Sequence, residues 1–241
     1  MRIRILTLFP EMFEGFLTTS IISRAIAKDK INIDCINIRD YSKDKHHHVD
    51  DTPFGGGHGM VMQYQPMLDA LNDIRTVDSK VLLMSPTGSV FNQKKAREIS
   101  LLNDIIIICG HYEGIDARIV DHVDEVISIG DYILTGGELA SMIVSDAVIR
   151  LIDGVITKDS HMDESFENGL LEYPQYTKPA IYNGKSVPDV LLSGHHENIR
   201  RFRLKKSLET TYLNRPDLLE NRNFSDEEKI LMKEIKESIE K

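Results

Sequence analysis

The sequence predicts an α/β fold with a parallel sheet, followed by a small helical domain, and three observations lead to this prediction. Over residues 1–150, segments rich in apolar and β-branched residues alternate with helical segments, and such alternation is typical of a parallel sheet covered by helices. Residues 104–109 consist of one aspartate, four isoleucines and one cysteine, as expected for a strand buried on both faces. Beyond residue 154 helical patterns dominate.

The elements can be assigned in order along the chain. Strands are expected at residues 2–8, 31–38, 80–84, 104–109 and 124–129, and helices at residues 11–28, 65–75, 92–100, 116–122 and 137–152. A polar stretch at 157–169 reads as a linker or a mobile active-site segment. An irregular stretch follows, and then helices are expected at residues 196–211, 215–220 and 225–240. Ser225 and Glu228 have the spacing of a capping box at the start of the last helix.

Composition sets further limits. The chain has 241 residues, a balance of hydrophobic and charged residues that is ordinary for a globular protein, and no stretch that approaches the length of a membrane span. Cys35 and Cys109 are far apart and lie in apolar runs, so we expect buried free thiols and a reducing cytosol. Three adjacent histidines, residues 46–48, cannot easily converge on one ion, so we expect no metal site.

The charge distribution bears on nucleic-acid binding. The net charge of −9 argues mildly against it, because phosphate binders usually carry a basic surface. A local basic cluster nevertheless occurs within the helix expected at 196–211, and it is either an RNA-binding surface or a solvated helix face. Its members are Arg200, Arg201, Arg203, Lys205 and Lys206.

Three glycine-bearing loops follow expected strands. They comprise residues 85–88, 109–114 and 128–138. Open α/β sheets hold their ligands at the carboxyl ends of the strands, so the three loops predict one composite pocket. None of them has the dinucleotide-binding or Walker A pattern. The glycine-dense residues 55–59 do not follow a strand directly, which favours a flexible loop that shapes a site over a phosphate cradle.

At this point the residues resemble a known family, the bacterial tRNA (guanine-N1)-methyltransferases, or TrmD family, of the SPOUT superfamily. The resemblance extends over nearly the whole chain and rests on several motifs in order. These are Leu8-Phe9-Pro10-Glu11-Met12-Phe13, Val49-Asp50-Asp51 with Gly55–Gly57, Gly110-His111-Tyr112-Glu113-Gly114-Ile115-Asp116, Ser128-Ile129-Gly130-Asp131-Tyr132 with Gly136-Gly137-Glu138, Gly169-Leu170-Leu171, and Leu191-Leu192-Ser193-Gly194 followed by Ile199-Arg200-Arg201.

The resemblance implies a deep trefoil knot in the sheet and a homodimer whose active sites use both subunits. It implies a knotted methyltransferase domain at residues 1–156, a mobile linker at 157–170 and a helical tRNA-binding domain at 171–241. It also implies S-adenosylmethionine as the cofactor and the guanine immediately 3′ of the tRNA anticodon as the substrate. The positions that match cofactor contacts are Pro86, Gly110, Glu113, Ile129, Gly130, Asp131, Tyr132, Ile133, Leu134 and Gly137.

The resemblance also implies the catalytic residues. Arg150 matches a catalytic arginine, and the general base is an aspartate that directly precedes Ser-Phe in the linker. Here that position is Glu164, followed by Ser165-Phe166, and Asp163 is the neighbouring alternative. Because guanine N1 carries a proton, a carboxylate must accept it as the methyl group arrives, and a fixed arginine can stabilise the charge that moves to O6. The base must also leave its stack to expose N1.

Three other functions are possible. A related enzyme that acts on rRNA is disfavoured, because an arginine and a carboxylate suit deprotonation of a base better than methylation of a ribose. A non-catalytic RNA-binding module would not need the pocket. A helix-turn-helix DNA binder is disfavoured by the acidic charge and the lack of a recognition-helix pattern, so we expect tRNA as the partner, and neither DNA nor a membrane.

Overall fold

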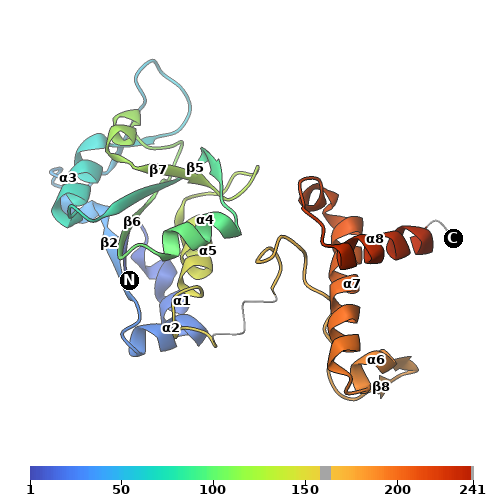
Figure 1. Cartoon of the computed structure of the whole chain (residues 1–241). Coiled ribbons are helices and arrows are strands. Elements are labelled where there is room, and N and C mark those ends of the chain that lie inside the picture. Colours follow the sequence, from blue (N-terminus) through green and yellow to red (C-terminus); the bar gives the residue numbers. More distant parts are fainter. Residues whose placement is uncertain (158–163, 240–241) are drawn as a thin grey trace. The chain divides into compact units, whose positions relative to one another are not determined.

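The computed structural model describes residues 1–157 and 164–239 of the chain. The chain divides into two compact units, Met1–Thr157 and Lys158–Lys241 (Figure 1). Each unit has its own hydrophobic core. We describe each unit separately. Within the described ranges, we find no helix long and apolar enough to cross a bilayer.

The first unit is built on a five-stranded parallel sheet with the strand order β2-β1-β6-β5-β7. The strands are β1 (Arg2–Thr7), β2 (Asn32–Asn37), β5 (Lys80–Val90), β6 (Asp104–Cys109) and β7 (Glu125–Ser128). The remaining strands of this unit, β3 (Asp50–Asp51) and β4 (Val61–Met62), form a short antiparallel pair. These findings confirm the predicted α/β class and the parallel sheet.

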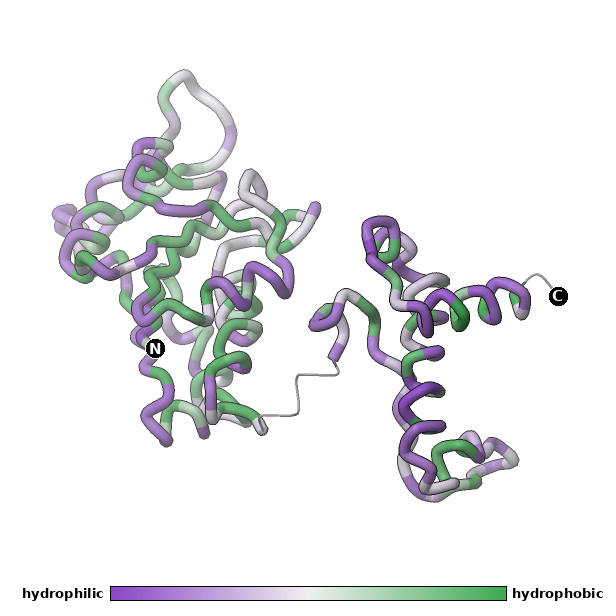
Figure 2. The backbone as a smooth tube through the Cα atoms, viewed as in Figure 1, coloured by the Kyte–Doolittle hydropathy of each residue, from purple (hydrophilic) through white to green (hydrophobic). Residues whose placement is uncertain are grey.

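Helices cover both faces of this sheet, which explains why the central strand β6 is apolar on both of its faces (Figures 1 and 2). Side chains from α1 (Glu14–Thr18), α2 (Ser20–Ala27), α4 (Gln93–Ser100) and α5 (Glu138–Ile149) pack on one face. The other face packs against η2 (Ile38–Tyr41), α3 (Tyr64–Ile74) and η3 (Ala117–His122). In the central strand β6, Ile105, Ile107 and Cys109 belong to the first core, whereas Ile106 and Ile108 belong to the second.

A buried charged cluster lies at the amino end of the sheet. Arg4 is 2% exposed and forms an ion pair with Asp104 of the adjacent strand β6. Ser79 connects the two, because its hydroxyl accepts from Arg4 Nη2 at 2.9 Å and donates to Asp104 Oδ2 at 2.7 Å. Burial of Asp104 raises the pKa of its carboxyl, but hydrogen bonds from Ser79 and Arg4 and the arginine charge prevail and lower that pKa below its ordinary value.

Several local predictions differ from the structure. The helices expected at 116–122 and 215–220 are short 3-10 helices. The helix expected at 11–28 is divided into η1 (Pro10–Phe13), α1 and α2, and the break occurs where Thr19 is extended and Ser20 has a φ of 54°. Residues 85–88, expected as a loop, lie within β5. The pairing of β5 with β7 shifts register between Met84 and Ser89, so these residues bulge and the strand then resumes.

The second unit is helical, with α6 (Asp189–Leu192), α7 (His196–Asn214), η4 (Pro216–Leu219) and α8 (Asp226–Ile239). Leu208, Leu231 and Ile235 form the centre of its core between α7 and α8. The predicted capping box is confirmed, since Ser225 N donates to Glu228 Oε2 at 2.8 Å and Glu228 N donates to Ser225 Oγ at 3.2 Å. A hairpin of β8 (Ile181–Tyr182) and β9 (Lys185–Ser186) precedes α6.

Candidate active site

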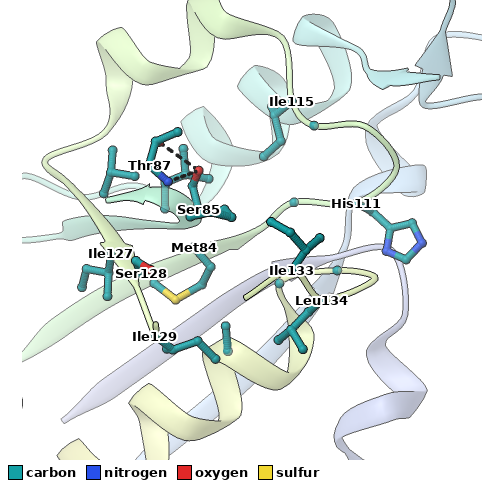
Figure 3. Close-up of a pocket in the computed structure, with 18 of the residues that line it drawn as sticks. Met84, Ser85, Thr87, His111, Ile115, Ile127, Ser128, Ile129, Ile133 and Leu134 are labelled. Atoms are coloured by element: carbon teal, nitrogen blue, oxygen red, sulfur yellow. Dashed lines mark hydrogen bonds between the residues drawn. The ribbon is translucent and has the colours of Figure 1, made fainter. Parts of the chain in front are cut away.

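A cavity of about 680 Å³ opens at the carboxyl ends of β5, β6 and β7 in the first unit. This is the location at which open α/β sheets bind ligands, and the volume is in the usual range for a small-molecule site. The three predicted loops all contribute to its wall, in the arrangement shown in Figure 3. Its lining residues come from three segments, Leu83–Thr87, Gly110–Val120 and Val126–Ala140. Some residues within these segments do not line the cavity.

All but one of the residues predicted for the cofactor line this cavity. They are Pro86, Gly110, Glu113, Ile129, Gly130, Tyr132, Ile133, Leu134 and Gly137. The remaining residue, Asp131, lies in the same loop, has an exposed side chain and is not among the lining residues. The structure therefore brings together residues that are separated by up to 51 positions in the sequence, from Pro86 to Gly137.

The bulge in β5 forms one side of the cavity. The pairing of β5 with β7 is interrupted after Met84 and resumes at Ser89. Within the bulge, Gly88 lies directly against the backbone of β7. A Cβ atom on Gly88 would lie 2.5 Å from the backbone nitrogen of Ile127, so only glycine permits this approach. Ser85 Oγ lies 3.0 Å from Thr87 Oγ1 and accepts from Thr87 N at 3.3 Å, and these bonds hold the bulge (Figure 3).

The loop after β6 is fixed by a second chain segment. Glu113 N donates to Met60 O at 3.0 Å, and Met62 N donates to Gly114 O at 2.9 Å. Gly59, the last glycine of the glycine-dense tract, lies under the Glu113 side chain, because a Cβ atom there would be 2.5 Å from Glu113 Cγ. The glycine-dense tract therefore connects directly to the wall of the cavity.

The loop after β7 returns to β6 at Gly137. Gly137 N donates to Gly110 O at 2.7 Å, and a Cβ atom on Gly137 would lie only 2.8 Å from the Cα atom of Cys109. A side chain at this position would therefore displace the β6 backbone itself. Cys109 is fully buried beneath the cavity, and burial raises the pKa of its thiol. Both cysteines are free, as predicted, but Cys35 is only partly buried, so the prediction that both thiols are buried was wrong for Cys35.

Next to the cavity is a buried polar cluster that the sequence analysis missed. Glu138 is 2% exposed and accepts a hydrogen bond from Thr7 Oγ1 at 2.8 Å, which links α5 to the end of β1. Its other oxygen lies 3.9 Å from Nδ1 of His111, whose ring contacts Phe9 with 4.9 Å between the ring centroids. Phe9, His111 and Glu138 each occur in a motif of the resemblance, but the sequence analysis assigned no role to them and did not place them together.

The predicted catalytic residues are distributed over the chain. Arg150 follows the last residue of α5 and forms the carboxyl-terminal cap of that helix. Glu164 is partly buried in the second unit. Asp163, the alternative base, lies outside the described residues. The roles of these residues therefore stay predictions.

The predicted RNA-binding arginines lie on α7, which is largely hydrophilic (Figure 2). Arg200 Nη2 forms ion pairs at 2.7 Å with both Glu197 and Glu227, and the paired carboxylates raise the pKa of its guanidinium. Arg201 pairs with Glu234 of α8 at 2.8 Å. The guanidinium of Arg203 lies over the ring of Tyr173, 4.8 Å from its centroid. These cations thus have partners within the unit.

The fold and the cavity define the class of this protein. It is an α/β protein with a cavity of small-molecule size at the loops that follow its adjacent parallel strands. The family model described as "tRNA (Guanine-1)-methyltransferase TrmD" matches residues 1–221. The chain therefore belongs to this family of methyltransferases.

Individual relatives agree with this assignment. A tRNA (guanine-N(1)-)-methyltransferase from Caldanaerobacter subterraneus subsp. tengcongensis is 54% identical over 232 residues, which are 95% of this chain and 96% of the relative. A protein with the same description from Clostridium botulinum (strain 657 / Type Ba4) is 52% identical over 241 residues, covering 99% and 100% of the two chains. One from Fusobacterium nucleatum is 53% identical over 237 residues and covers 98% of both.

Proposed function

We propose that this protein transfers a methyl group from S-adenosylmethionine to N1 of the guanine immediately 3′ of the anticodon in tRNA. The observation that carries the proposal is the cavity at the ends of β5, β6 and β7 in a chain of the tRNA (guanine-1)-methyltransferase family. Its volume suits a ligand of this size. The side chains of Ile129, Ile133 and Leu134 offer apolar contacts to an adenosine, and the Glu113 carboxylate offers a countercharge to a cation.

The chemistry follows from the groups that guanine presents. Bound S-adenosylmethionine supplies a methyl group on a sulfonium, so the residues of the chain mainly position the acceptor and move its proton. The Glu164 carboxylate accepts the proton as the N1–H bond breaks and the N1–methyl bond forms. The Arg150 guanidinium stabilises the negative charge that shifts to O6. Asp163 is the alternative proton acceptor.

We further propose the trefoil knot and the homodimer that the resemblance implies. The return of residues 128–137 to the backbone of β6, where Gly137 packs against Cys109, supports the knot. An exposed apolar patch supports the dimer. It consists of Met12 (45% exposed), Leu139 (49%) and Ile143 (48%), of which Met12 and Leu139 line the same small hollow and Ile143 lies one helical turn beyond Leu139.

The experiment that tests the proposed function is methyl transfer to defined RNA. Unmodified tRNA with guanine 3′ of the anticodon is incubated with the protein and methyl-labelled S-adenosylmethionine, and the labelled nucleoside is then identified. We expect 1-methylguanosine, and no label when adenine replaces that guanine. Label on a ribose, or label that persists after the replacement, contradicts the proposal.

A further inference from the structure

The segment Tyr173–Pro188 of the second unit, here called the arm, carries basic residues and no acidic one. The chain contains 38 aspartates and glutamates, yet the arm has none, whereas it contains Lys178 and Lys185. Both lysines are exposed, and within the described ranges neither forms an ion pair. The arm is therefore a small basic surface without a carboxylate of its own, between Glu172 and Asp189, on an acidic protein.

The arm also exposes apolar and aromatic side chains to an unusual degree. Ile181 and Tyr182 are each 69% exposed, and Tyr176 is 47% exposed. All residues from 174 to 186 are exposed. Aromatic rings that stand in solvent beside lysines are typical of surfaces that bind single-stranded nucleic acid, where bases stack on the rings and phosphates meet the cations.

A hairpin within the arm fixes the backbone of Ile181, Tyr182 and Lys185. Ile181 and Tyr182 of β8 pair with Ser186 and Lys185 of β9. The two-residue turn between them is Asn183-Gly184, with φ values of 49° and 75°, as required for a tight hairpin. Val187 N donates to Ala180 O at 2.8 Å and extends the pairing. Binding to the hairpin would therefore need little further ordering of its backbone.

Two of the three arginines of α7, Arg200 and Arg201, offer less to a polyanion than the arm does. Phosphate binding by Arg200 or Arg201 requires these side chains to exchange carboxylate partners that they already hold. Lys178 and Lys185 need no such exchange. A second protein chain matches the arm less well than RNA does. A protein partner would need acidic groups placed opposite the two lysines, whereas every nucleotide of RNA carries a phosphate anion.

We propose that the arm docks an unpaired loop of the RNA substrate, with Tyr176 and Tyr182 stacking on bases and Lys178 and Lys185 contacting phosphates. Bases in a duplex are already stacked, so rings of this kind select unpaired nucleotides. The proposal rests on the proposed function, because it assigns a docking surface for the RNA that is methylated.

The test compares tRNA binding by three variants of the full chain between 50 and 200 mM salt. In the double variant Lys178→Gln/Lys185→Gln, we expect weaker binding and a log–log salt slope smaller by about 1.4–1.8, since each lost phosphate contact contributes about 0.7–0.9. In Tyr182→Ala we expect affinity to fall by about 5- to 150-fold with an unchanged slope, whereas Tyr182→Phe retains binding. The KM for tRNA should rise while kcat and cofactor affinity stay unchanged.

The matched control is Lys229→Gln/Lys233→Gln, which removes the same charge from α8, where both lysines already pair with carboxylates. It should bind tRNA with the wild-type slope. The proposal is overturned if the arm variants bind tRNA with wild-type affinity and salt slope. It is also overturned if they lose self-association and keep RNA binding, because the arm would then be a protein interface.

The wild type separates this proposal from the proposed function. If it binds tRNA through the arm without methylating it, only the proposed function fails. If it binds no tRNA, the proposed function and the docking proposal both fail.

Discussion

In the proposed reaction the Glu164 carboxylate accepts the proton from guanine N1, and a single substitution tests this role. Glu164→Gln preserves size and hydrogen bonding but removes basicity, so methylation at saturating tRNA should fall by about 10²-fold or more. Cofactor binding, measured by calorimetry, should be unchanged. Asp163→Asn should be milder, because Glu164 is the residue directly before Ser165-Phe166. Collapse in the Asp163 variant with normal turnover in the Glu164 variant would reverse the assignment.

Ile133 provides a clean test of the cofactor site. It lines the cavity yet is 80% exposed, so its replacement should not affect folding. Ile133→Asp places a carboxylate at an apolar wall, and we expect S-adenosylmethionine affinity to fall at least tenfold, or about 1.4 kcal/mol. Calorimetry measures this, with Leu101→Asp, 81% exposed and outside the cavity lining, as the control. If both variants lost the same amount of S-adenosylmethionine affinity, the effect would come from the added negative charge and not from the cavity wall.

The Arg4–Asp104 pair should contribute to stability in a pH-dependent way. Because the folded pKa of Asp104 is lowered, its contribution is fully present above the unfolded pKa of about 3.9 and is lost as pH falls through the lower folded value. Asp104→Asn at pH 7 should reduce the free energy of unfolding by about 3–5 kcal/mol, since it leaves Arg4 buried without a charged partner.

Urea unfolding at several pH values measures this effect. The control is Asp34→Asn, which breaks the exposed pair of Arg2 and Asp34 on the neighbouring strands and should cost less than about 1 kcal/mol. If the two variants lost a similar free energy of unfolding, the buried pair would contribute no more to stability than the exposed pair.

At the scale of the element, the capping box of α8 should stabilise the second unit. Ser225→Ala removes the hydroxyl that accepts from Glu228 N, and we expect a loss of about 1 kcal/mol in the free energy of unfolding. Ser238→Ala near the other end of α8 removes a hydroxyl that donates to the carbonyl of Ile235 within the same helix, and it serves as the control. If both variants unfold at the wild-type urea concentration, the box contributes nothing to stability.

Elements with strong local patterns were predictable from the sequence, and those that depend on distant partners were not. The apolar run of β6 and the Ser225–Glu228 spacing each specify one structure locally. The bulge in β5 was missed, because it depends on the contact of Gly88 with β7. The ion pairs of Arg200 and Arg201 depend on where α8 packs. The β8–β9 hairpin had a readable signal, Asn183-Gly184, which was read only as part of an irregular stretch.

The candidate site shows the same division. The cavity loops were predictable because parallel strands bring their carboxyl ends to one edge, which is a rule of the fold class. Glu138 was missed because a carboxylate buried against Thr7 is a property of tertiary packing across 131 positions.

At the scale of the whole molecule, we expect a homodimer with a mass twice the 27.4 kDa of the chain. Leu139→Asp/Ile143→Asp introduces charges into the exposed apolar patch of α5 and should give a monomer in light scattering. The control, Val77→Asp/Leu101→Asp, changes two apolar residues that are more exposed and lie elsewhere on the first unit. A wild-type monomer, or a dimer that survives the α5 changes, contradicts this assignment.

The strand order β2-β1-β6-β5-β7 has a consequence for biosynthesis on the ribosome. β1, β2 and β5 leave the ribosome before β6, yet β6 lies between β1 and β5. Until residue 109 has emerged, the facing edges of β1 and β5 lack their partner, and open strand edges promote aggregation. We therefore expect nascent chains that end before β6 to depend on chaperones, and chains released after residue 157 to escape that dependence.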